Sequence, residues 1–158
     1  MIAAHQLAAA GTEDGRLQAE IAPLYVPPHF DTVLETDNGV RTDTSAEALA
    51  KLRPAFDRKH GSVTAGNASP LTDGGSAVML MSEEQVKAEG IEPMGYVRSY
   101  AFSGLDPHGQ LLQGPAYATS IALDRAGVTM ADIDLMEVHE AFASQVLSNL
   151  QALSSKKF

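Results

Sequence analysis

The pentapeptide His139-Glu140-Ala141-Phe142-Ala143 is the first candidate for chemistry, because it lies where a predicted buried strand passes into a predicted helix. Side chains at the carboxyl end of a strand in an α/β sheet face the crevice where ligands bind. A histidine there can donate a hydrogen bond, directly or through water, to a developing oxyanion. From position alone, a structural or surface histidine is the more common case. A zinc-protease motif is excluded, because the residue four positions after His139 is Ala143 and not a second histidine.

The stretch Gly66-Asn67-Ala68-Ser69, followed by Pro70, is the second candidate. Small residues let a ligand approach the backbone, and Ser69 before Pro70 predicts a short helix whose first N–H groups are free. The pattern lacks the glycine spacing of a nucleotide-binding loop. A tight strand-to-helix turn is the alternative, and it is slightly favoured without further information.

Basic residues gather in one part of an acidic chain. Five of the 11 lysines and arginines fall between positions 41 and 59, namely Arg41, Lys51, Arg53, Arg58 and Lys59. Such a stretch can steer a phosphorylated ligand, although a solvated loop and helix face is an equally simple reading. The remaining histidines share no metal-ligand spacing, so no metal site is predicted.

Alternating strands and helices must position these candidates. Cap and periodicity signals predict helices over 1–11, 44–53 (N-cap Thr44), 82–90 (N-cap Ser82), 115–127 and 140–153, with single turns at 70–73 and 129–132. Apolar runs predict strands over 20–26, 77–81, 94–102 and 133–138. The alternation indicates an α/β fold in which helices cover a sheet.

Composition narrows the class of protein. The 158 residues carry 20 acidic and 11 basic side chains, a net charge of −9 and 44% hydrophobic residues. A chain of this length buries roughly 70% of its unfolded surface, which indicates one domain or part of a larger one. The acidity argues against a nucleic-acid-binding protein, and the longest apolar run is too short to span a bilayer. No signal peptide is evident, so we expect a cytoplasmic protein. The absence of cysteine excludes disulfides, thiolate zinc sites and a cysteine nucleophile from these residues.

Taken together, four segments resemble thiolases. They are Leu49-Ala50-Lys51-Leu52-Arg53-Pro54-Ala55-Phe56, the run from Ser62 to Gly75, the run from Leu111 to Thr119, and the pentapeptide at 139–143. Most thiolases have asparagine where this chain has His139. Histidine there is similar to the 3-ketoacyl-CoA thiolases (acetyl-CoA acyltransferases) of the trifunctional-enzyme β-subunit type.

The resemblance implies a partial thiolase fold of the α/β class. Residues 1–81 would be the end of the N-terminal domain with part of the loop domain, and residues 82–158 the first part of the C-terminal domain. The implied reaction is acyl transfer between acyl-CoA and CoA in fatty-acid β-oxidation. Coenzyme A and 3-ketoacyl-CoA would bind as substrates, and no cofactor would be held permanently.

Site residues follow from the same resemblance. His139 matches the residue that orients a water or oxygen in the oxyanion hole, and Glu140 and Phe142 build its wall. Arg41 falls where the family has a basic residue near the CoA nucleotide. The loop that lines the pantetheine channel matches the small residues Ala65, Ala68 and Ser69.

Three of the family's four catalytic loops lie outside this sequence. The Cys-x-Ser nucleophile motif would lie upstream, and the Gly-His-Pro and Cys-x-Gly motifs downstream, so we expect the chain to be a thiolase fragment that is inactive alone. The full-length enzyme is expected to form a thiolase-type homo-oligomer and to pair with a hydratase/dehydrogenase subunit. The alternatives are a non-catalytic CoA-binding or assembly module and a structural partner that completes an active site with another polypeptide.

Overall fold

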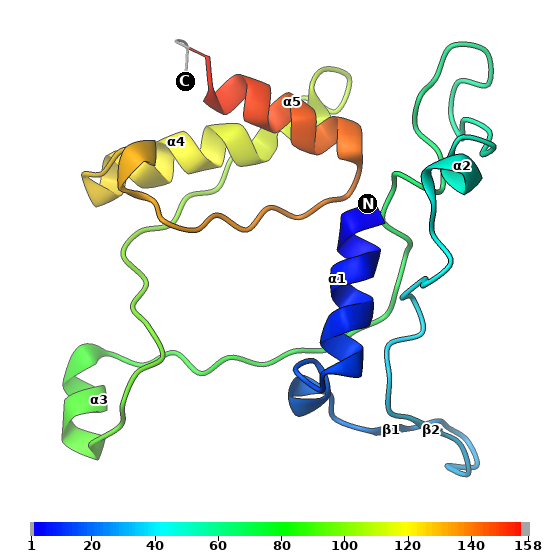
Figure 1. The fold of residues 1–158 in the computed structure, drawn as a ribbon. Coiled ribbons are helices and arrows are strands. Elements are labelled where there is room, and N and C mark those ends of the chain that lie inside the picture. The colour runs from blue at the N-terminus through cyan, green and yellow to red at the C-terminus, as the bar shows by residue number, and fades with distance from the viewer. Residues whose placement is uncertain (1, 156–158) are drawn as a thin grey trace. The chain divides into compact units, whose positions relative to one another are not determined.

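The computed structural model describes residues 2–155 and divides into two compact units, 1–70 and 71–158 (Figure 1). Unit 1 begins with helix α1 (Ile2–Glu13), as the sequence predicts, and continues through the short 3-10 helix η1 (Gln18–Glu20). Strand β1 (Leu24–Tyr25) pairs antiparallel with β2 (Val33–Leu34), with Leu24 opposite Leu34. The strand predicted over 20–26 is therefore reduced to two residues, because η1 occupies its start and proline at position 23 cannot donate to a ladder.

Helix α2 (Ala46–Leu49) corrects the predicted helix over 44–53. Its N-cap is Ser45 and not Thr44: Ser45 Oγ accepts a hydrogen bond from the Ala48 N–H at 3.1 Å. The Thr44 hydroxyl instead donates to the Arg41 carbonyl at 3.4 Å. After Leu49 the chain tightens into turns closed by bonds between residues three apart, which brings the regular helix to an end before Pro54.

Unit 2 holds the elements whose cap signals were clearest. Helix α3 (Glu83–Glu89) has Ser82 as its N-cap and Gly90, at φ +64°, as its left-handed terminator. The short helix η2 (Leu111–Gln113) leads directly into α4 (Gly114–Ala126), which ends at Gly127 with φ +68°. The single turn η3 (Met130–Asp132) follows, and α5 (Ala143–Leu153) is the last helix.

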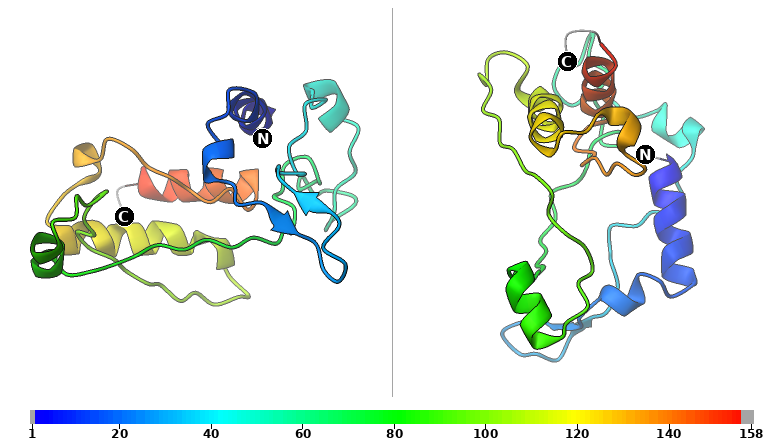
Figure 2. Two further views of the ribbon diagram at one scale, coloured as in Figure 1. Left: turned by 90° about the horizontal axis from the view of Figure 1, so that it is seen from below. Right: turned by 90° about the vertical axis from the view of Figure 1, so that its left-hand side faces the viewer.

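Helices α4 and α5 lie side by side in both figures and form the packed part of unit 2 (Figures 1 and 2). Ala116 on α4 is fully buried, and Ala152 on α5 is buried. The face that α5 buries is not purely apolar: Leu147 is 67% exposed, whereas the polar residues Gln145 and Asn149 are buried. The interface between the helices is therefore closed by small and polar side chains.

An extended segment runs along α4 in the opposite direction. Ser99 Oγ donates to the Ala122 carbonyl at 2.6 Å, and Ser103 Oγ donates to the Gly114 carbonyl at 2.8 Å. Between them, Arg125 Nη1 donates to the Tyr100 carbonyl at 2.6 Å. Three hydrogen bonds from side chains to backbone carbonyls therefore attach this segment to the helix.

The strands predicted over 77–81, 94–102 and 133–138 do not form in the part of the chain that the structure describes, where β1 and β2 are the only paired strands. These segments are also not buried as apolar strands would be, since Val78 is 82% exposed and Leu135 is 81% exposed. These segments stay extended because a strand requires a neighbour that accepts and donates its backbone hydrogen bonds. None of the helices within residues 2–155 is long and apolar enough to cross a membrane.

Candidate functional site

His139 and Glu140 lie on the extended stretch that leads into α5, and both are exposed. Phe142 occupies the N-cap position of α5 in extended conformation and is half-buried. Helix α5 begins at Ala143, three residues later than the predicted start at Glu140, and no strand precedes it. The imidazole of His139 is thus presented to solvent from an extended backbone, with its neighbours anchored by the helix that follows.

The loop at 62–69 is held by the side chain of Asn67. Its Oδ1 accepts from the Thr64 N–H at 2.8 Å and its Nδ2 donates to the Ser62 carbonyl at 2.8 Å. The predicted turn of helix at 70–73 is wrong, because the chain is irregular from Ser69 to Ser82. The run of four residues from Pro70 to Asp73, which ends at a glycine pair, is too short to offset the cost of helix nucleation. The loop therefore offers no helix N-terminus for an anion.

Small side chains expose the backbone of the same loop. Ala65 and Ser69 are exposed and Ala68 is half-buried. Gly66 fits against α2 and the turn after it: a Cβ placed there would lie 2.4 Å from Leu49 Cδ2 and 2.7 Å from Leu52 Cδ1. The absence of a side chain at position 66 is what allows the loop to pack on these two leucines.

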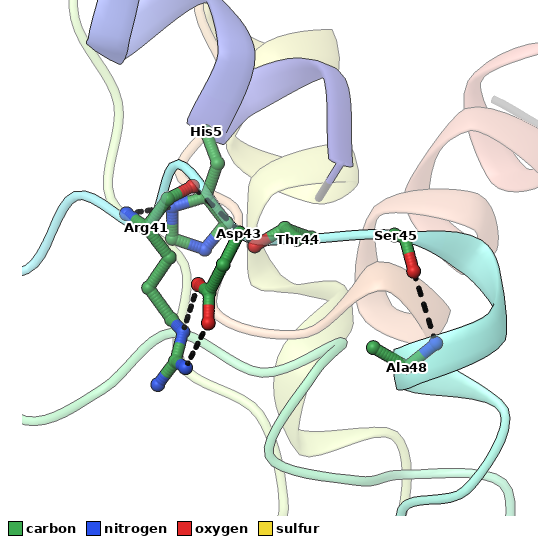
Figure 3. Close-up of polar contacts among 6 residues, drawn as sticks. All are labelled: His5, Arg41, Asp43, Thr44, Ser45 and Ala48. Atoms are coloured by element: carbon green, nitrogen blue, oxygen red, sulfur yellow. Dashed lines mark hydrogen bonds and ion pairs between the residues drawn. The ribbon is translucent and has the colours of Figure 1, made fainter.

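Arg41 is engaged by Asp43 (Figure 3). The guanidinium donates from Nε to Asp43 Oδ1 at 3.2 Å and from Nη2 to Oδ2 at 3.0 Å, in a forked arrangement that leaves both side chains exposed. The hydrogen bond from Arg41, with its positive charge, holds the pKa of the Asp43 carboxyl below its usual range. The backbone N–H of Arg41 donates to His5 Nδ1 on α1 at 3.3 Å, which fixes the segment from its other side.

The seven candidate residues fall into two groups. Arg41, Ala65, Ala68 and Ser69 belong to unit 1, whereas the group at 139–142 belongs to unit 2. Within residues 2–155, no three histidine, aspartate or glutamate side chains are grouped so that they could hold a metal ion. For the other basic residues between 51 and 59, no ion pair is formed with any carboxylate of the described chain. Arg41 is the member of that stretch that is already paired.

Sequence reasoning missed Asn149, which organises unit 2. Its Oδ1 accepts from the Ala116 N–H at 3.0 Å, and its Nδ2 donates to the carbonyls of Leu112 at 2.8 Å and Gln145 at 2.9 Å. Since Gln113 supplies no side-chain cap, Asn149 satisfies a free N–H in the first turn of α4 from a different helix. The available signal was an asparagine in a helix interior, where its propensity is poor.

A cavity of about 380 Å³ lies beside η2 and the first turn of α5, and no predicted site residue lines it. The buried Oε1 of Gln145 has no hydrogen-bond partner in the part of the chain that is described. The lining residues are Gly109, Gln110, Leu111, Leu112, Gln113, Ser144, Gln145 and Ser148.

Residues 1–84 match the thiolase N-terminal domain and residues 91–157 match the thiolase C-terminal domain, so the chain belongs to the thiolase family and its fold is part of the thiolase fold. The domain boundary between 81 and 82 stays a prediction.

Individual relatives are similar along almost the whole chain. The protein named 3-ketoacyl-CoA thiolase from Yersinia enterocolitica is 54% identical over 154 residues, which are 98% of this chain and 35% of that relative. The crystal structure of human mitochondrial 3-ketoacyl-CoA thiolase in complex with CoA is 37% identical, with a TM-score of 0.82 over 97% of this chain and 37% of its own. The dimeric peroxisomal thiolase of Saccharomyces cerevisiae is 33% identical, with a TM-score of 0.84 over 94% of this chain and 37% of its own.

Proposed function

We propose that this chain is part of a 3-ketoacyl-CoA thiolase, an acyltransferase that exchanges acyl groups between CoA thioesters in fatty-acid β-oxidation. The observation that carries the proposal is 54% identity over 98% of the chain to a protein of that name. Because the chain spans 35% of that relative's length, the activity of the whole enzyme is part of the proposal.

In the proposed site, His139 donates a hydrogen bond, directly or through water, to the thioester oxygen as negative charge develops on it. Its support is the exposed position of the imidazole just before α5. Glu140 and Phe142 form the adjoining wall, and the seating of Phe142 at the start of α5 supports that assignment for the ring.

On the coenzyme side, Arg41 attracts the phosphates of the CoA nucleotide, and Ala65, Ala68 and Ser69 line the path of the pantetheine arm. The support is the small size of the loop residues, which leaves backbone accessible, and the forked donors of Arg41. The presence of CoA in the human relative's structure supports a CoA ligand for this family member.

The chain by itself is proposed to lack thiolysis activity, because it contains no cysteine and therefore no thiolate to attack the 3-keto group. The purified 158-residue chain should not consume acetoacetyl-CoA and CoA above the uncatalysed rate, measured by loss of absorbance of the magnesium enolate. The full-length Yersinia enterocolitica relative serves as the positive control. Turnover by the chain alone that scales with its concentration contradicts this proposal.

Two other functions have an observation in their favour. A non-catalytic CoA-binding or assembly module fits a chain that keeps Arg41 and the loop at 62–69 without a nucleophile. A structural partner that completes an active site fits the segments at 77–81 and 133–138, which form no strand and are exposed apart from the half-buried Val138. Restored turnover on mixing with separately made flanking segments of a thiolase favours the second. A thiolase-type homo-oligomer, a hydratase/dehydrogenase partner and a cytoplasmic location stay predictions.

A further inference from the structure

Asp43 occupies the donor face of Arg41 in this structure. Two nearly parallel hydrogen bonds, at 3.2 and 3.0 Å, join the guanidinium to both carboxylate oxygens. A planar guanidinium binds a phosphate through the same fork of donors. A phosphate that reaches Arg41 must therefore take the place of the Asp43 carboxylate or share the guanidinium with it.

The backbone around the pair is held on both sides (Figure 3). His5 Nδ1 accepts from the Arg41 N–H, the Thr44 hydroxyl donates to the Arg41 carbonyl, and the next residue, Ser45, caps α2. Because the N–H and carbonyl of Arg41 both form hydrogen bonds and Ser45 caps α2, Asp43 between them stays within reach of the guanidinium. The Asp43 carboxylate can therefore move away from a bound ligand only by rotation of its own side chain.

We propose that Asp43 is an intramolecular competitor for Arg41, which lowers the affinity of this chain for the phosphates of CoA and favours ligands of higher negative charge. The proposal rests on the proposed function, in which Arg41 binds the CoA nucleotide. The pair is exposed, at 67% for Arg41 and 71% for Asp43, so a dianionic phosphate can displace the singly charged carboxylate. Exposed pairs of this kind are weak, which sets the expected gain on removing Asp43 at about two- to five-fold in affinity.

The chain provides a matched control pair. Arg16 and Asp14 are also an exposed pair two residues apart, in the reverse order, in which Arg16 Nε donates to both carboxylate oxygens, at 3.0 Å to Oδ1 and 2.8 Å to Oδ2. Asp14→Asn therefore changes the net charge by the same amount as Asp43→Asn and frees an arginine elsewhere. A difference between the two variants reports on Asp43 itself and not on the overall charge.

The experiment measures binding of CoA and of pantetheine, which lacks phosphate, to the full 158-residue chain by isothermal calorimetry at two salt concentrations. We expect Asp43→Asn to bind CoA about two- to five-fold more tightly than the wild type, Asp14→Asn to match the wild type, and Arg41→Gln to bind more weakly. The gain should shrink at the higher salt concentration and be absent for pantetheine.

Each departure from this pattern has one meaning. If Arg41→Gln weakens CoA binding while Asp43→Asn leaves it unchanged, the competitor role of Asp43 is wrong and the proposed CoA site stands. An equal gain with Asp14→Asn, or an equal gain for pantetheine, also overturns the competitor role. If Arg41→Gln has no effect, or if neither the wild type nor Asp43→Asn binds CoA, the proposed site at Arg41 is wrong, and the inference about Asp43 is overturned with it.

Discussion

At the scale of single residues, buried polar groups decide the packing of unit 2. The Asn149 side chain is 2% exposed, and its carboxamide uses both its donor and its acceptor on other segments. Gln113 Nε2 adds a second link across the same interface, to Ser148 Oγ at 2.6 Å. Because only a few apolar side chains are buried in the described chain, these polar contacts carry more of the specificity than they would in a larger core.

Asn149→Leu should destabilise unit 2 by about 2–4 kcal/mol, because it leaves the Ala116 N–H and the Leu112 carbonyl buried without partners. Urea unfolding followed by circular dichroism measures the change. Gln151→Leu, at an exposed position of the same helix, is the matched control and should stay within about 0.5 kcal/mol of the wild type. Equal stability of the two variants contradicts the role given to Asn149.

Gly66→Ala should destabilise unit 1 by about 1–3 kcal/mol, because its Cβ would overlap the side chains of Leu49 and Leu52. Gly75→Ala is the control, since a Cβ there meets no atom within 4 Å. In the double variant with Leu49→Ala, the added methyl should cost less than it does alone, because one of the two overlaps is removed. Thermal unfolding of five chains tests this, namely the wild type, the Gly66→Ala, Gly75→Ala and Leu49→Ala variants and the double variant, and equal costs at positions 66 and 75 would refute it.

At the scale of elements, the sequence predicts what local chemistry determines. Ser82 and Gly90 delimit α3, Gly127 ends α4, and Thr129 with Asp132 forms a single turn, because each signal acts on backbone groups within four residues. The predictions of strands at 77–81 and 133–138 are wrong for the opposite reason. A strand depends on a partner strand from any part of the sequence, and the described residues supply none to these segments.

The same distinction between local and long-range interactions applies to the candidate site. The sequence alone predicts the candidate residues by their type, and it also predicts the basic stretch that contains Arg41. The pairing of Arg41 with Asp43, and the cap that Asn149 provides to α4 across 33 residues, depend on tertiary placement. No periodicity or cap signal carries that information.

The turn η3 should show a pH dependence of its stability through Asp132. Hydrogen bonds from the Thr129 N–H and hydroxyl, both at 2.8 Å, lower the pKa of the Asp132 carboxyl. A carboxyl with a depressed folded pKa contributes stability above its unfolded pKa of 3.8 and loses it as the pH falls through the folded pKa. Asp132→Ala should therefore lower the Tm at neutral pH, and the difference from wild type should shrink between about pH 5 and pH 3. A difference that is constant over this range contradicts the assignment.

At the scale of the whole molecule, two compact units are joined at an exposed stretch. Residues 71–82 are all exposed and belong to no helix or strand. Such a segment adapts readily to the extended conformation that a protease requires, whereas the hydrogen-bonded helices of either unit do not.

Limited proteolysis with chymotrypsin should therefore cleave between positions 71 and 81, where leucine and methionine are exposed, before it cleaves within the helices, and mass spectrometry identifies the products. Substitution of Leu71, Met79, Leu80 and Met81 by serine should remove that cut, while cuts at exposed aromatic residues such as Phe102 are kept. A first cut within α4 or α5 of the wild type would show that the boundary lies elsewhere.

The two serines that attach the extended segment to α4 also fix the alignment of that segment along the helix. Ser99 and Ser103 are four residues apart, which is about 13 Å of extended chain, and the carbonyls that they reach are eight residues apart, which is about 12 Å of helix. The two lengths agree only in this alignment, so a slip of one residue detaches one serine or the other. Insertions and deletions are usually tolerated in segments without regular structure. Between positions 99 and 103, however, the chain is as intolerant of a change in length as a strand in the middle of a sheet.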